Sequence, residues 1–198
     1  MPNLHDATFV AGAVRLRDLP PDTGYEVAFT GRSNAGKSSA LNILTGRSGL
    51  ARVSKTPGRT QQLNVFALDA SHRLIDLPGY GYAKVPQALR QGFLTLISDY
   101  LSERRSLQAL VLLADIRHGL KTEDRALLAK RADLPILVLL SKADKVNRSE
   151  RAKQTREMAK SAPSNAFFLP FSAHSQEGVE EARALVLGFL KLDDRAPS

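Results

Sequence analysis

Residues 31–39 combine residue types and a spacing that suit the binding of phosphate groups. They read GRSNAGKSS and fit the pattern G-x-x-x-x-G-K-[ST], whose glycines let successive backbone N–H groups point at phosphate oxygens. Lys37 places a positive charge against the β- and γ-phosphates, and the Ser38 hydroxyl is placed to bind Mg²⁺. A glycine-rich turn before an ordinary helix is the alternative interpretation. The predicted phosphate-binding residues are Gly31, Arg32, Ser33, Asn34, Ala35, Gly36, Lys37 and Ser38.

The segments on either side of this loop favour the phosphate-binding interpretation. Residues 26–30 read as a buried strand, and residues 40–44 read as a helix that stops near Gly46. This strand–loop–helix order is the context that the motif requires, and the positive N-terminal end of the helix would act on the same anion. The sequence therefore predicts a P-loop for a nucleoside triphosphate.

Composition limits the class of protein further. The 198 residues fit one domain, and a hydrophobic content of 43% is typical of a globular chain. The absence of cysteine excludes a disulfide framework and a thiolate metal site. Residues 1–17 lack the apolar core of a signal peptide and no run reaches the length of a membrane span, so we expect a cytoplasmic protein. A net charge of +8 favours a polyanionic partner such as RNA, although DNA and an acidic membrane surface stay open.

Strand and helix patterns alternate along the chain after a weakly patterned lead-in, residues 1–24. The link 69–72 is too short for a crossover, so the strands on either side of it must be antiparallel. We predict an α/β fold with a mainly parallel six-stranded sheet, one antiparallel strand and helices on both faces. The nucleotide-binding domain would span residues 25–192, with a short tail at 193–198. The predicted strands are 26–30, 63–68, 73–76, 109–114, 135–140 and 166–170, and the later helices are 87–103, 122–131, 149–160 and 178–191.

Three further segments follow predicted strands and narrow the choice of nucleotide. Asp76 with Leu77, Pro78 and Gly79 suits a Walker-B carboxylate near Mg²⁺, with the Gly79 N–H available to the γ-phosphate, although such an aspartate also commonly caps a turn. The segment Ser141-Lys142-Ala143-Asp144 offers a carboxylate to N1–H and the 2-amino group of guanine, a donor pair that adenine lacks. A solvated Lys/Asp turn is the alternative. The backbone of Phe171-Ser172-Ala173 could reach the guanine O6, and ligands of open α/β sheets bind at this edge.

Taken together, these segments resemble the EngB family of bacterial GTP-binding proteins, also called YihA or YsxC. The resemblance implies a Ras-like P-loop GTPase domain that binds Mg²⁺ with GTP or GDP. It also implies a role in assembly of the large ribosomal subunit, with its RNA and proteins as partners, and a link to cell division and septation. We expect a monomer. The matching segments are Gly31–Ser38, Gly58–Gln62, Asp76–Ala83, Ser141–Asp144 and Phe171–Ala173.

The resemblance also assigns roles by position. Ser38 and Thr60 become the Mg²⁺ ligands, and the switch segment that closes on the γ-phosphate is Gly58, Arg59, Thr60, Gln61 and Gln62. Lys37, Thr60 and Gly79 become the groups that serve catalysis. Ser141 departs from the family's usual Thr and from the Asn of other GTPases. Because a hydroxyl is kept, we expect guanine specificity with weaker bracing, and a backbone contact should tolerate Ala173.

Tyr80 occupies the place where small GTPases commonly carry a glutamine that orients the attacking water. Tyrosine cannot do this in the same way, so intrinsic hydrolysis should be slow and a partner would complete the site. Alternatively, Asn34 helps to bind K⁺ in place of an arginine finger. An ordinary loop role for Asn34, tolerant of left-handed geometry, is equally open.

Two clusters of basic residues have two possible interpretations, a surface that contacts RNA or a charged face exposed to solvent. One lies in residues 47–60, which we expect to form a long mobile loop, and the other in the helix near residues 149–160. A GTP-dependent binding module without useful hydrolysis remains an alternative function. A P-loop kinase is a second alternative, although no Arg-rich lid segment is found. The basic residues are Arg47, Arg52, Lys55 and Arg59 in the loop and Arg148, Arg151, Lys153, Arg156 and Lys160 in the helix.

Overall fold

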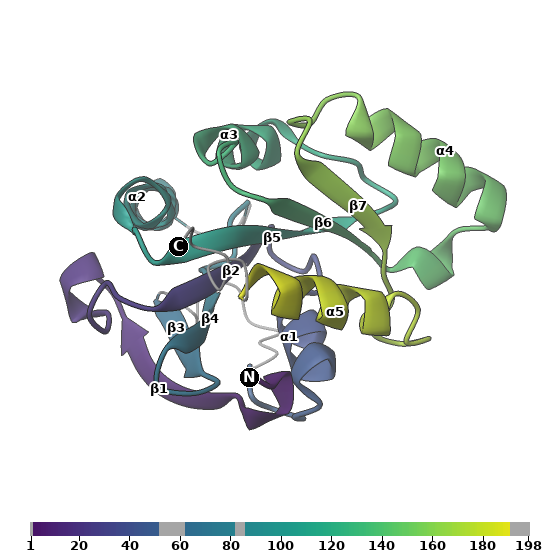
Figure 1. Ribbon diagram of the computed structural model, residues 1–198. Coiled ribbons are helices and arrows are strands. Elements are labelled where there is room, and N and C mark those ends of the chain that lie inside the picture. Colours follow the sequence, from purple (N-terminus) through teal and green to yellow (C-terminus); the bar gives the residue numbers. More distant parts are fainter. Residues whose placement is uncertain (1, 52–61, 82–85, 191–198) are drawn as a thin grey trace, which may run out of the picture.

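The computed structural model describes residues 2–51, 62–81 and 86–190 and contains a seven-stranded sheet in the order β1-β3-β4-β2-β5-β6-β7 (Figure 1). Three short 3₁₀ helices span Leu4–Asp6, Leu16–Asp18 and Ala143–Lys145. The strands are β1 Thr8–Ala13, β2 Tyr25–Gly31, β3 Leu63–Ala67, β4 His72–Asp76, β5 Leu107–Asp115, β6 Ile136–Ser141 and β7 Ala166–Pro170. The α-helices are α1 Lys37–Thr45, α2 Gln87–Glu103, α3 Thr122–Lys130, α4 Arg148–Ala159 and α5 Val179–Phe189.

Strand directions confirm the predicted α/β class with a mainly parallel sheet. β3 runs antiparallel to both of its neighbours, β1 and β4, and the other neighbouring pairs are parallel. The predicted number of six strands is wrong, because β1 adds a seventh at the edge beside β3. β1 lies inside the segment that we interpreted as a weakly patterned lead-in. Its alternation is hidden because Phe9 and Val10 are half exposed and a register shift falls between Phe9 and Ala11.

Helices cover both faces of the sheet, as predicted. α1 and α5 lie on one face, and α2, α3 and α4 lie on the other (Figure 1). β6 is buried along its whole length and β5 along most of it, which explains their continuous apolar sequences. The apolar stripe of α5 is buried against the sheet and consists of Val179, Ala182, Val186 and Phe189. No helix in residues 2–51, 62–81 or 86–190 is both long and apolar enough to cross a bilayer.

The parallel strands bring their C-terminal ends to one edge of the sheet. This edge therefore carries Gly31 from β2, Asp76 from β4, Asp115 from β5 and Ser141 from β6. The strands fix these positions relative to one another through their registers, since Phe29 pairs with Asp76 and Asp115 pairs with Ser141. The loops that follow these residues form the candidate site.

Candidate functional site

The predicted P-loop connects the end of β2 to the start of α1. Gly36 is the N-cap of α1 and has a φ of 93°, a backbone conformation that a side chain would strain. At Gly31 an added Cβ would lie 2.7 Å from the carbonyl oxygen of Leu113 on β5. Asn34 lies between them in the left-handed region, with a φ of 63°. The loop thus holds its N–H groups and the start of α1 at the sheet edge, as anion binding requires.

The predicted phosphate-binding lysine and the predicted Walker-B carboxylate lie together. The Lys37 ammonium forms an ion pair with Asp76, and the two side chains are only 10% and 4% exposed. Asn64 donates to the other oxygen of Asp76 at 3.3 Å and accepts a hydrogen bond from Gln62 at 3.0 Å. Sequence reasoning missed Asn64, although a polar residue on an otherwise apolar strand was an available signal. Its position opposite Asp76 comes from the register of β3 and β4.

The segment after Asp76 runs directly beside the P-loop. Leu77 N–H donates to the Phe29 carbonyl at 2.9 Å, and Ser33 N–H donates to the Tyr80 carbonyl at 2.7 Å. These contacts hold Pro78 and Gly79 next to the P-loop. The Ser33 hydroxyl is buried without a hydrogen-bond partner among the described residues.

Tyr80 turns its side chain into the core instead of into the site. The ring is 1% exposed, and its hydroxyl donates to Asp124 Oδ1 at 2.6 Å in the first turn of α3. Burial, reinforced by the neighbouring Asp124 carboxylate, raises the pKa of Tyr80 well above its ordinary value. A buried, neutral phenol committed to Asp124 is poorly suited to orient a water at the γ-phosphate.

The two predicted base-binding loops come together at the ends of β6 and β7. Ala143 N–H donates to the Phe171 carbonyl at 3.1 Å, and Ser172 Oγ donates to Asp144 Oδ1 at 2.7 Å. The hydrogen bond from Ser172 lowers the pKa of Asp144, so this carboxylate is an acceptor at neutral pH. A cavity of about 930 Å³ connects these loops to the start of α1, and its lining includes Gly36, Ser39, Lys142, Asp144, Ser172 and Ala173.

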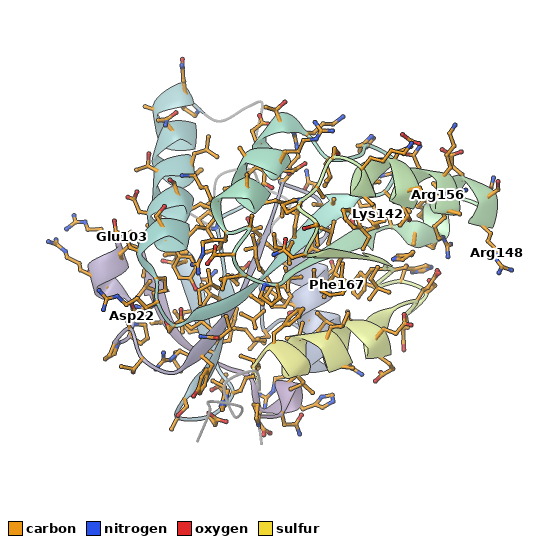
Figure 2. The ribbon with its side chains drawn as sticks, turned by 45° about the horizontal axis from the view of Figure 1, so that its top comes forward. Asp22, Glu103, Lys142, Arg148, Arg156 and Phe167 are labelled. Atoms are coloured by element: carbon orange, nitrogen blue, oxygen red, sulfur yellow. The ribbon has the colours of Figure 1, made fainter. Side chains whose placement is uncertain are left out.

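Lys142, labelled in Figure 2, links the predicted base-binding loops to the P-loop. Its ammonium donates to the Asn34 carbonyl at 2.9 Å and lies 2.9 Å from Asp115 Oδ2. Burial alone would raise the pKa of Asp115, but hydrogen bonds from Arg117 and Lys142 outweigh it and hold that pKa well below its usual range. Sequence reasoning missed Asp115, although it ends a buried strand just as Asp76 does. Ser141 is buried, and its hydroxyl donates to the Ala114 carbonyl at 3.3 Å, which ties β6 to β5.

The predicted switch segment is represented here by one residue. Gln62 lies just before β3, against Gly12 of β1. Most of the predicted loop 47–60 lies outside the described residues, as do Gly58, Arg59, Thr60 and Gln61. Ser38 lies in the first turn of α1, next to Lys37.

A P-loop, an ion-paired lysine and aspartate at the predicted γ-phosphate end, and an ionised aspartate in a predicted base-binding loop share one edge of a mainly parallel sheet. Together they define a P-loop GTPase. A family model described as "50S ribosome-binding GTPase" matches residues 26–142.

Comparison with known proteins identifies the family more closely. A probable GTP-binding protein EngB of Coxiella burnetii is 48% identical over 190 residues, which cover 93% of each chain. The Haemophilus influenzae protein of the same name is 46% identical over 187 residues, covering 92% of this chain and 91% of its own. A crystal structure of a probable GTP-binding protein EngB, 23% identical, superposes with a TM-score of 0.66 over 84% of this chain and 98% of that one. The chain belongs to the EngB family of GTP-binding proteins and is a GTP-hydrolysing enzyme.

Proposed function

We propose that this GTPase is a slow, Mg²⁺-dependent switch in assembly of the large ribosomal subunit, with a link to cell division and septation. It would act in the cytoplasm as a monomer. The observation that carries the nucleotide assignment is the Asp144–Ser172 pair, which faces the P-loop across one cavity. The description of the matching family model and the net charge of +8 support a ribosomal partner.

The residues at the γ-phosphate end suit a magnesium ion held largely by the nucleotide. The described residues contain no group of three or more histidine and acidic side chains that could hold a metal. Mg²⁺ commonly uses few protein ligands together with phosphates and water, so Ser38, Thr60 and the nearby Asp76 are a sufficient set. When bound, the ion would neutralise charge that develops on the phosphate oxygens. Lys37 would add its own charge at the same oxygens.

The geometry of Tyr80 supports slow hydrolysis by the protein alone. Because its hydroxyl is committed to Asp124, the water-orienting group must come from elsewhere, and a ribosomal particle is the proposed source. Single-turnover hydrolysis with and without large subunits tests this proposal. Stimulation by the subunits supports the switch, and equal turnover in both conditions would refute it.

We further propose Asn34 as a contributor to a K⁺ site that assists hydrolysis. Its left-handed backbone and exposed side chain at the P-loop are compatible with this role. Turnover should then be faster in K⁺ than in Na⁺ buffers. Equal rates would leave Asn34 as a loop residue whose carbonyl receives Lys142.

Nucleotide affinity of the wild type and of Asp144→Asn tests the guanine assignment. We expect the wild type to prefer GDP over ADP. The amide of Asn can still accept from Ser172, but it presents donors where guanine also presents donors. Losing two hydrogen bonds to a charged acceptor should weaken GDP binding by about 100-fold or more, while XDP binding improves because xanthine has an acceptor at that position. Asp133→Asn, which alters an exposed carboxylate paired with Arg131, is the matched control. Equal affinity of the wild type for ADP and GDP would refute the assignment.

A further inference from the structure

The segment from Lys145 to Lys160, which includes α4, is strongly basic. It contains six basic and two acidic side chains, a net charge of +4 and thus half of the +8 of the whole chain. α4 has twelve residues, of which Met158 is the buried one. A helix with one buried residue adds little to the core, so packing does not explain its composition.

Except for Arg151, the basic side chains of α4 and of its C-cap Lys160 gather on the outer side of the helix. At 3.6 residues per turn, they fall within an arc of about 140°, opposite Met158. All are exposed, and Figure 2 shows Arg148 and Arg156 at the periphery of the molecule. Glu157 pairs with Lys160 at 2.8 Å, whereas Arg148, Lys153 and Arg156 have no carboxylate within ion-pair distance in the described chain. We call this surface, formed by Arg148, Lys153, Arg156 and Lys160, the α4 basic face.

A single arginine on the inner side of α4 fixes the helix to the base-binding loops. Arg151 donates to the Ala143 carbonyl at 2.8 Å and forms an ion pair with Glu177. The Glu177 carbonyl in turn accepts from Ser172 N–H at 3.0 Å. Arg151 therefore touches one base-binding loop directly and reaches the other through Glu177. The α4 basic face consequently keeps a fixed position relative to the guanine end of the cavity.

We propose that the α4 basic face docks on the phosphate backbone of RNA and so holds the guanine end of the nucleotide site against the RNA. This inference rests on the proposed ribosomal function and adds the surface that makes the contact. Charge complementarity favours a polyanion, and phosphates can be contacted by arginine and lysine without an apolar anchor. A membrane-binding helix needs large apolar side chains on its exposed side. The exposed apolar residues of α4 are Ala152 and Ala159, which excludes that mode of binding.

Charge reversal of three exposed residues tests the proposal. The variant R148E/K153E/R156E is compared with R15E/R17E/R125E, which changes net charge equally at exposed positions elsewhere. The probe is the purified large ribosomal subunit with a non-hydrolysable GTP analogue, titrated at several salt concentrations. We expect the α4 variant to bind at least about tenfold more weakly, with a slope of log affinity against log salt that is shallower by about 2 to 3. Its GDP affinity should equal that of the wild type, and the control should keep both affinities.

Several outcomes would overturn the proposal without touching the nucleotide assignment. Equal weakening in the α4 variant and the control would mean that only net charge matters. An unchanged salt slope in a weakened α4 variant would indicate a protein contact, and wild-type binding to anionic vesicles instead of RNA would indicate a membrane. If R148E/K153E/R156E loses GDP binding, the triple alanine variant replaces it, because alanine preserves the helix.

A further titration distinguishes failure of the proposed ribosomal function from failure of the α4 proposal. If the wild type does not bind the large subunit, both variants are titrated against an isolated ribosomal RNA transcript. If only the α4 variant binds the transcript more weakly, the RNA-binding role of the α4 basic face is supported and the proposed ribosomal function is refuted. If the wild type does not bind the transcript either, both the proposed RNA-binding surface and the proposed ribosomal function are refuted.

Discussion

Removal of the Tyr80 hydroxyl tests whether this residue has a structural role or a catalytic role in the predicted site. Tyr80→Phe removes one oxygen atom and leaves the ring in the core. That oxygen donates to Asp124 Oδ1 at 2.6 Å, and both residues are almost fully buried. Asp124 keeps one hydrogen bond, from Lys121 N–H to Oδ2 at 2.7 Å. The substitution therefore leaves a buried carboxylate with one partner fewer.

The magnitude of the effect follows from this geometry. A hydrogen bond to a charged group contributes about 1.5–3 kcal/mol, so the free energy of unfolding should fall by about 2 kcal/mol. For a chain of this size each 1 kcal/mol lowers Tm by about 2–4 °C, which gives a decrease of about 4–8 °C. Because the hydroxyl points into the core below α3, the single-turnover rate should change by less than about threefold, or about 0.7 kcal/mol in activation free energy.

Urea unfolding of the nucleotide-free protein and single-turnover GTP hydrolysis are the two measurements. Tyr25→Phe is the matched control, because the Tyr25 ring stacks on His72 and its hydroxyl donates no hydrogen bond in the described structure. Its stability should stay within about 0.5 kcal/mol of the wild type. A tenfold or greater loss of hydrolysis in Tyr80→Phe with unchanged stability would refute the reasoning, because the hydroxyl would then act on the reaction.

Two carboxylates give the remaining predictions. Asp115→Ala removes the anion beside Lys142 and should weaken GDP binding by about tenfold in a fluorescence titration, while Asp133→Ala leaves it unchanged. Because the folded pKa of Asp115 is depressed, its ionised form stabilises the protein above its ordinary pKa and this contribution is lost as pH falls. The stability difference between wild type and Asp115→Asn in urea should therefore stay level from about pH 7 to about pH 5 and shrink as pH falls below about 5. Glu26→Gln disrupts a fully buried carboxylate paired with Arg104 and should cost about 3–5 kcal/mol in unfolding free energy, with GDP affinity retained because Glu26 lies near the opposite end of β2.

Much of the fold follows from local patterns. β5 and β6 were predictable because burial on both faces requires continuous apolar sequence. α2 was predicted with the bounds Gln87–Glu103 that the structure shows. β1 was missed because an edge strand with exposed side chains keeps little alternation, and its pairing with β3 depends on residues fifty or more positions away.

The site divides in the same way between local and long-range information. The P-loop and the Ser141–Asp144 segment each consist of consecutive residues, so their chemistry can be predicted from the sequence. The role of Asn64 depends on the β3–β4 register and that of Arg151 on how α4 docks, and neither follows from one sequence alone. Asp115 could have been predicted, because it lies at the carboxyl end of a parallel strand, as Asp76 does.

Backbone strain in the described chain is concentrated where the nucleotide would bind. Three residues other than glycine have a positive φ, namely Asn34, Lys142 and Gln176, and each lines a cavity beside the P-loop or the base-binding loops. Such conformations cost about 1–3 kcal/mol each, and glycine would relieve that cost. For Lys142 the compensation is visible, because its ammonium contacts both the Asn34 carbonyl and Asp115. A side chain kept at a position where glycine would be less strained is best explained by its function, and here that function is to hold the P-loop and the base-binding loops at a fixed separation.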